Sequence, residues 1–320
     1  MYSFFSLASK DDITYYDHIE NTILAFIKSE FFPWVCLILL LNKTKNWKNS
    51  VTTILLVHWF LRSLGDALRK CSYLLPITDH EDTEKTVWPH SKSRWIVGNA
   101  IAHIFWLSGE IVGDWYLYIR TKIVTNDRKK INLVLYCCII YNIIKVCGIL
   151  IYFIFIPDDF NLYDENNDIK NTLLFFNIVW WFIVIFINIT CFIYDCSVIY
   201  SLRTDLFYKL YQYKKYCKDS FLEKFKKISE LRIFTTMGAT LLTLPIIISI
   251  VCFLISQYIT ETDSSHSFID PEPIRKLPIS LYYNLIYIDQ ILIKFYVNSN
   301  QNQDSYSKFI FIECDQNDQS

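Results

Sequence analysis

The sequence TLLFFNIVWWFIVIFINITCFIYDCSVIYSL, residues 172–202, decides the fold class of this chain. Asp195 is its only charged residue. An α-helix rises about 1.5 Å per residue, so about 20 apolar residues suffice to cross the hydrocarbon core of a bilayer. The stretch is therefore long enough to span a membrane as one helix.

Six further apolar stretches have a similar length, and together they predict an all-α fold, a seven-transmembrane helix bundle over residues 23–297. The first stretch is the weakest, because Lys28, Glu30 and Pro33 interrupt it. Helices are expected because a helix satisfies its own backbone hydrogen bonds in lipid. The seven predicted spans are 23–41, 51–76, 95–119, 132–156, 172–202, 231–257 and 277–297.

The composition excludes several other classes of protein. Hydrophobic residues make up 52% of the 320 residues, charged residues 20%, and the net charge is -1. The charges cluster in short blocks between the apolar stretches, which argues against a soluble enzyme, a nucleic-acid binder and a disordered chain. Most of the ten cysteines lie inside the spans, and no CxxC, HExxH or Gly-x-Ser-x-Gly motif occurs. We therefore expect no enzymatic activity, no cofactor and no metal site.

The basic residues of the connecting segments predict the direction of the chain, because cytoplasmic loops of membrane proteins are enriched in Lys and Arg. The first, third and fifth loops carry three, five and eight basic residues, which is 16 together, against seven in the N-terminal segment and the even-numbered loops. Residues 1–22 are therefore expected outside the cell or in a lumen. Residues 298–320, rich in Asn, Gln and Asp, are expected to form a disordered cytoplasmic tail.

Ionisable residues inside the spans are the candidate functional residues, because a charge in hydrocarbon is costly unless it is paired or used. The candidates for a ligand or ion site are Arg62, Asp66, Glu110, Asp114, Lys145 and Asp289. Counting helical rise from the cytoplasmic ends places four of them about 13–20 Å deep, near the middle of the bilayer. These four are Arg62, Glu110, Lys145 and Asp289, with the two cations as counter-charges of the two acids.

The predicted midplane cluster has two interpretations that the sequence leaves open. Paired charges can fix the packing of the helices, or they can bind a ligand, an ion or a proton. Asp114 and Asp195 lie closer to the cytoplasmic ends of their spans, and we expect them to contact the inner loops.

Two further features concern the sixth span and the loop before it. Pro245 lies in the middle of the span and removes a backbone hydrogen bond, so it is a candidate hinge. The basic segment 203–230, which carries several tyrosines, is expected to continue the fifth helix. It is a possible contact for a cytoplasmic signalling partner or for lipid headgroups.

The span count, the direction of the chain, Pro245 and the long basic third inner loop resemble the layout of G-protein-coupled receptors and microbial rhodopsins. The local motifs differ. Tyr118-Ile119-Arg120 retains only the Arg of the receptors' acidic-Arg-aromatic triplet, and span seven has no Asn-Pro-x-x-Tyr. Lys294, the only Lys of span seven, lies toward the cytoplasmic end, which does not fit a retinal linkage at mid-helix.

The leading hypothesis is a receptor-like protein, of GPCR-like architecture, that signals through its basic cytoplasmic loops, with the plasma membrane as its expected location. Its mechanism would be a movement of span six about Pro245. One alternative is a proton or ion transporter or channel that uses the midplane charges. Another is a structural or biogenesis membrane protein without a ligand.

Overall fold

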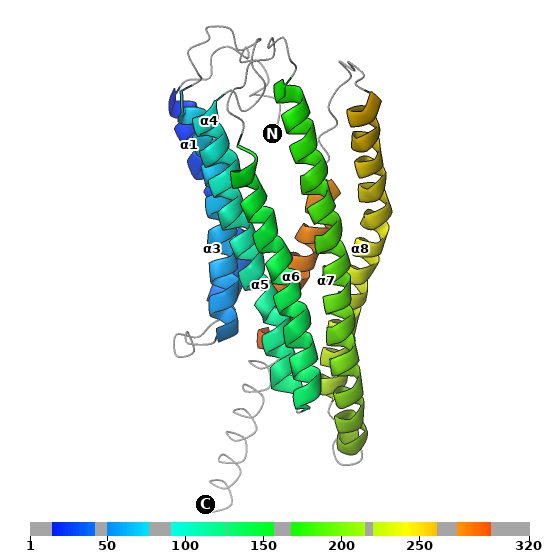
Figure 1. Ribbon diagram of the computed structural model, residues 1–320. Helices are drawn as coiled ribbons and strands as arrows, with labels where there is room; N and C mark the ends of the chain where they lie inside the picture. Colours follow the sequence, from blue (N-terminus) through cyan, green and yellow to red (C-terminus); the bar gives the residue numbers. More distant parts are fainter. Residues whose placement is uncertain are drawn as a thin grey trace, which may run out of the picture.

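The computed structural model describes residues 15–41, 50–76, 91–125, 127–156, 168–214, 220–260 and 274–295. Every regular element in these ranges is helical, and none of them contains a strand. The prediction of an all-α fold is therefore confirmed. The long helices run side by side in one elongated bundle (Figure 1).

Eight α-helices, α1 to α8, follow one another along the described residues. A further helix over 274–295 is drawn in orange in Figure 1. A 3₁₀ turn, Ser72–Leu74, follows α3, and a π-helical stretch, Ile96–Ile101, joins α4 to α5. The bounds are α1 Tyr15–Ile27, α2 Phe32–Leu41, α3 Ser50–Cys71, α4 Lys92–Trp95, α5 Ala102–Val124, α6 Arg128–Ile154, α7 Asp168–Lys214 and α8 Ser220–Thr260.

Five of the described helical segments are long and apolar enough to cross a membrane, and a bent pair of helices adds a sixth. The pair is α1 and α2, which meet at 48°. The break falls at residues 28–31, beside the interruption expected in the first span, and Pro33 begins the new helix in its first turn, where proline is tolerated. The five segments are Val51–Leu74, Lys92–Ile123, Arg128–Ile154, Thr172–Leu202 and Leu231–Thr260.

The helix over 274–295 corresponds to the seventh predicted span, but it is not among the described segments that are long and apolar enough to cross a membrane. It carries Lys276, Asp289, Gln290 and Lys294. Asp289 and Gln290 are buried, as are Tyr283, Ile286 and Tyr287. Two of the polar residues of this helix therefore point into the bundle. By length and composition, then, five or six spans are shown in the described residues rather than seven.

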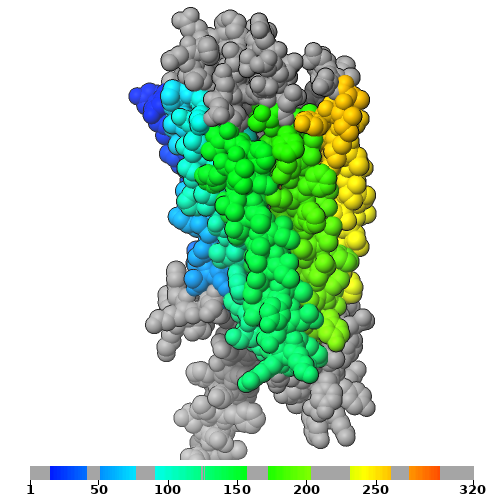
Figure 2. Space-filling model, in the orientation of Figure 1, coloured from blue at the N-terminus to red at the C-terminus, as the bar shows by residue number. Residues whose placement is uncertain are grey.

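The outer surface of the bundle is apolar, as expected for contact with lipid. Large hydrophobic side chains are exposed along α6, where Figure 2 shows the surface formed by α6 and α7 in green. Exposed apolar side chains in such numbers would aggregate in water. The helices and this surface indicate an integral membrane protein. The α6 side chains include Leu133, Tyr136, Ile140, Ile143 and Leu150.

The apolar core consists of two clusters that follow one another along the bundle. The first contains Tyr116 and Leu117 of α5 and Ile233 of α8. The second contains Leu107 of α5 and Ile247 of α8. The residues of α5 between Leu107 and Tyr116 include two buried acids, so a polar layer separates the two apolar clusters.

The basic segment 203–230 is largely helical, because α7 continues to Lys214 and α8 begins at Ser220. This agrees with the expected continuation of the fifth helix. The predicted N-terminal segment 1–22 is helical from Tyr15 onward. Residues 1–14 and the predicted tail 298–320 lie outside the described residues.

Close packing of α3 on α5 depends on Gly65. A Cβ atom at this position would lie 2.4 Å from the Trp106 ring, whereas a Cβ at Gly238 of α8 would meet nothing within 4 Å. We expect Gly65→Ala to lower the free energy of unfolding in detergent micelles by about 1–3 kcal/mol, because the Trp106 side chain must move.

Gly238→Ala is the matched control, and we expect it to raise the free energy of unfolding by up to about 1 kcal/mol through helix propensity. Denaturant unfolding followed by tryptophan fluorescence measures both changes. Equal effects of the two substitutions would contradict the proposed role of Gly65 in the contact between α3 and α5.

Candidate functional site

Four charged side chains from three helices form one buried group, here called the Lys145 network. Arg62 of α3 donates to Glu110 of α5 at 2.7 Å. Lys145 of α6 lies 3.3 Å from the other Glu110 oxygen and 2.8 Å from Asp114 of α5. All four residues are buried, with Asp114 fully inaccessible and Lys145 1% exposed. Two cations and two carboxylates thus balance each other inside the bundle, which offsets the cost of removing them from water.

Tyr283 ties the helix over 274–295 to this network. Its hydroxyl lies 3.0 Å from the Asp114 carboxylate, to which it donates, and 3.0 Å from the Glu110 carbonyl oxygen. Lys145 in turn donates to the Tyr283 oxygen at 3.4 Å. The Tyr283 ring packs 4.3 Å from His58 of α3, centroid to centroid. Four helices therefore converge on the Lys145 network.

A second charged group, the Asp289 network, joins the helix over 274–295 to α5 and α8. Asp289 forms ion pairs with Arg120 of α5 and with Arg232 of α8, the latter at 2.5 Å. Tyr116 donates to Asp289 at 2.7 Å and accepts from Gln290 at 2.8 Å. The five side chains are all buried. A single carboxylate here holds two arginines from two different helices.

Asp195 of α7 lies beside this arrangement but forms no ion pair with any described residue. Its Oδ2 accepts from Thr236 of α8 at 3.1 Å, and its Oδ1 is buried without a hydrogen-bond partner. Thr236 lies one helical turn from Arg232, on the same face of α8. The Nη2 atom of Arg232 is also buried without a partner in the described residues. The unpaired carboxylate of Asp195 on α7 is thus held by a residue of α8, Thr236, that lies one turn from the partly unsatisfied Arg232.

The structure brings three of the four predicted midplane charges together and places the fourth elsewhere. Arg62, Glu110 and Lys145 converge as expected, with the two cations as counter-charges of Glu110. Asp289 does not join them, because its counter-charges are Arg120 and Arg232.

Two acids expected near the inner loops lie inside the bundle instead. Asp114 binds Lys145, and Asp195 binds Thr236. The helices continue beyond the predicted spans, α5 to Val124 and α7 to Lys214, so both acids lie deeper than counting from the predicted span ends suggests.

The two remaining candidates lie apart from these networks. Asp66 accepts a hydrogen bond from Trp106 Nε1 at 3.0 Å. Pro245 lies inside α8, which continues through it as one helix from Ser220 to Thr260. Leu241 and Leu242, in the turn before it, are 52% and 74% exposed, whereas Thr240 and Thr243 are buried, so α8 has one outward and one inward face here.

Arg120 and Arg232 have a central place that the sequence reasoning did not give them. Arg120 follows the predicted end of span three, and Arg232 is the second residue of predicted span six. Both resemble basic residues that flank a span. A helix drawn one turn longer at each of these ends would have placed both arginines inside the bundle.

The described residues contain no group of three or more His, Cys, Asp or Glu side chains placed to hold a metal ion. The two networks hold charged side chains of different helices together in a buried interior. Repacking of ion pairs between helices is a recurrent part of conformational switching.

Comparison with protein-family models, with curated proteins and with solved structures finds no match. The class of the protein therefore rests on the fold and the site. The chain is a helical integral membrane protein with two buried charge networks, each of which binds the helix over 274–295 to its neighbours.

Proposed function

We propose that this protein is a seven-helix, receptor-like membrane protein that signals by moving α8. The broken pair of α1 and α2 and the helix over 274–295 would complete the seven spans. The distribution of Lys and Arg supports a cytoplasmic position for the basic segment 203–230, with an outside N-terminus and a cytoplasmic C-terminus.

One observation carries the proposal, namely the unequal distribution of two arginines, Arg120 and Arg232, over two carboxylates, Asp289 and Asp195. Asp289 already pairs with Arg120, whereas Asp195 has no cation among the described residues. If Arg232 moved from Asp289 to Asp195, each carboxylate would have one arginine, so the same four side chains would have a second pairing. A two-state element of this kind is what a ligand can bias.

The surroundings of α8 support such a movement. Gly238 has open space around its Cα, and Pro245 lacks the backbone donor that would hold its turn. Arg232 and Pro245 are 13 residues apart, or about 20 Å along the helix. A small change of angle near Pro245 would therefore move Arg232 by several ångströms and carry the basic segment before it.

The distance between the lower ends of α6 and α8 tests the movement. Spin labels introduced as unnatural amino acids at the exposed positions Leu133 and Leu231 leave the native cysteines in place. Pulsed dipolar spectroscopy of the reconstituted protein should show two distance populations, and Pro245→Ala should reduce the minor one. A single narrow distance, unchanged by Pro245→Ala, would overturn the proposal and favour a structural protein without a ligand.

Proton or ion transport is the second candidate, favoured by the unpartnered oxygens of Asp195 and Asp289 inside the bundle. Buried acids of this kind form relays in pumps and transporters. The same protein in proteoliposomes separates the two functions. A receptor should show no proton or cation flux under a pH gradient or a voltage. A flux that Asp289→Asn abolishes would make the buried acids a conduction path.

A further inference from the structure

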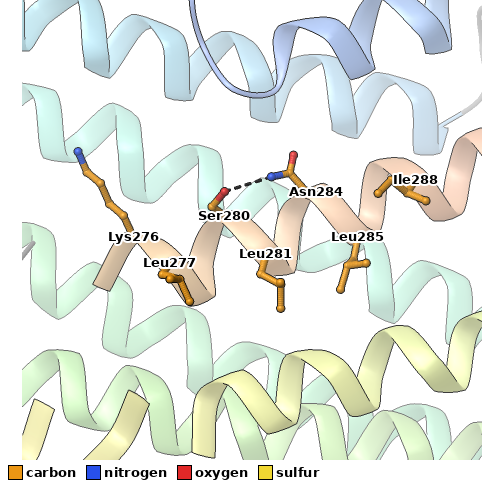
Figure 3. A pocket seen from close by; sticks show the side chains of 7 residues that line it. All are labelled: Lys276, Leu277, Ser280, Leu281, Asn284, Leu285 and Ile288. Carbon is orange, nitrogen blue, oxygen red and sulfur yellow. Dashed lines mark hydrogen bonds between the residues drawn. The ribbon is translucent and has the colours of Figure 1, made fainter. Parts of the chain in front are cut away.

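An open furrow of about 620 Å³ runs along the outer face of the helix over 274–295. Its apolar side is a stripe of Leu277, Leu281, Leu285 and Ile288, spaced at one helical turn. In Figure 3 the three leucines point to the side on which α8 lies, in yellow. Lys276 marks the end of the furrow at which the helix begins.

The length of the apolar stripe matches one leaflet of a bilayer. From Leu277 to Ile288 the helix rises about 16 Å, and the hydrocarbon core of a bilayer is about 30 Å thick. With Lys276 at the membrane interface, the stripe would reach about as far as the midplane. An apolar chain attached to a polar head would cover both parts of the furrow.

The polar groups of the furrow indicate the charge of that head. Ser280 donates to the Glu30 carboxylate at 2.6 Å, and Asn284 donates to Ser280 at 3.1 Å, while the Asn284 Oδ1 atom is buried without a partner in the described residues. Lys276 is exposed and makes no ion pair with any described residue. The Lys276 ammonium can donate charge-assisted hydrogen bonds to a phosphate.

We propose that the furrow binds one anionic phospholipid, with an acyl chain along Leu277, Leu281 and Leu285 and the phosphate at Lys276. The occupant is a lipid of the leaflet that surrounds the first half of the helix over 274–295, at the Lys276 end. Ile288, at the inner end of the furrow, directly precedes Asp289. A bound lipid would therefore press on the helix whose Asp289 pairs with Arg120 and Arg232. This effect of the lipid on the Asp289 network is the only part of the inference that rests on the proposed function.

Lipid retention by the full-length protein tests the site. Detergent-solubilised protein is incubated with phosphatidylglycerol or phosphatidylcholine and then examined by native mass spectrometry. We expect one retained phosphatidylglycerol, favoured about fivefold over phosphatidylcholine, and loss of that preference in Lys276→Gln. Leu281→Trp should fill the furrow and reduce the retention of both lipids. Lys122→Gln, at an exposed lysine near the opposite end of the bundle, is the control.

Equal retention of the two lipids by the wild type, or retention unchanged in Lys276→Gln and Leu281→Trp, would overturn the proposal and leave ordinary bulk lipid along this helix. Thermal unfolding of each variant is compared with that of the wild type, and an unchanged unfolding temperature separates a loss of lipid binding from misfolding. Asp289→Asn separates this inference from the proposed function, because that variant should retain the lipid even if α8 does not move.

Discussion

Asp289→Asn is expected to lower the free energy of unfolding by about 3–5 kcal/mol, the cost of leaving a buried charge without its partner. The substitution removes the only carboxylate that pairs with both Arg120 and Arg232 among the described residues. Denaturant unfolding in micelles, followed by tryptophan fluorescence, gives the value. Asp66→Asn is the matched control. It should cost under about 1 kcal/mol, because an amide oxygen can still accept from Trp106.

Second substitutions distinguish a static pair from the proposed switch. If Asp289→Asn releases Arg232 to Asp195, the label-to-label distance between α6 and α8 should shift toward its minor population. Adding Asp195→Asn should then cost far more in the Asp289→Asn background than in the wild type, a coupling that a double-mutant cycle measures. Additive effects, with no change of distance, would show that Asp289 only stabilises the bundle.

The sequence predicts contacts between residues that lie well inside their helices, because helical rise alone gives their level. It does not predict contacts of residues near the predicted span ends, because those ends are uncertain by a turn or more. Arg62, Glu110 and Lys145 lie well inside their helices, so counting about 1.5 Å per residue places them correctly at one level. The same count does not place Asp289 correctly, because its partners Tyr116 and Arg120 lie six and ten residues beyond Glu110 along α5. Its partners come from α5 and α8 across the bundle, and no periodicity in the chain specifies that neighbour relation.

The first and last predicted spans show a second limit. Lys28, Glu30 and Pro33 do mark the break between α1 and α2, because the interruption is written locally in the chain. The helix over 274–295 is polar enough to resemble a weak span, and its polar groups are accounted for only when Tyr283 and Asp289 meet their partners on other helices. Local composition therefore predicts helices better than it predicts which of them face lipid.

Lys145→Met is expected to lower the free energy of unfolding by about 3–5 kcal/mol. Methionine fills a similar volume, so the loss would arise from charge rather than from packing. Glu110 would retain Arg62, but Asp114 would keep only the Tyr283 hydroxyl as a side-chain partner in the described residues. A carboxylate that is fully buried without a cation must bear most of the penalty.

Asp114→Asn in the Lys145→Met background should therefore recover most of the lost stability, because the Arg62–Glu110 pair remains balanced by itself. The control is Lys129→Met, at an exposed lysine in the first turn of α6, which should change the free energy of unfolding by less than about 0.5 kcal/mol. Should Asp114→Asn fail to restore stability, the penalty would lie in the packing of α6, and the Lys145 network would not act as one electrostatic unit. Recovery would assign the network a role in holding four helices together, which leaves the movement of α8 to the Asp289 network alone.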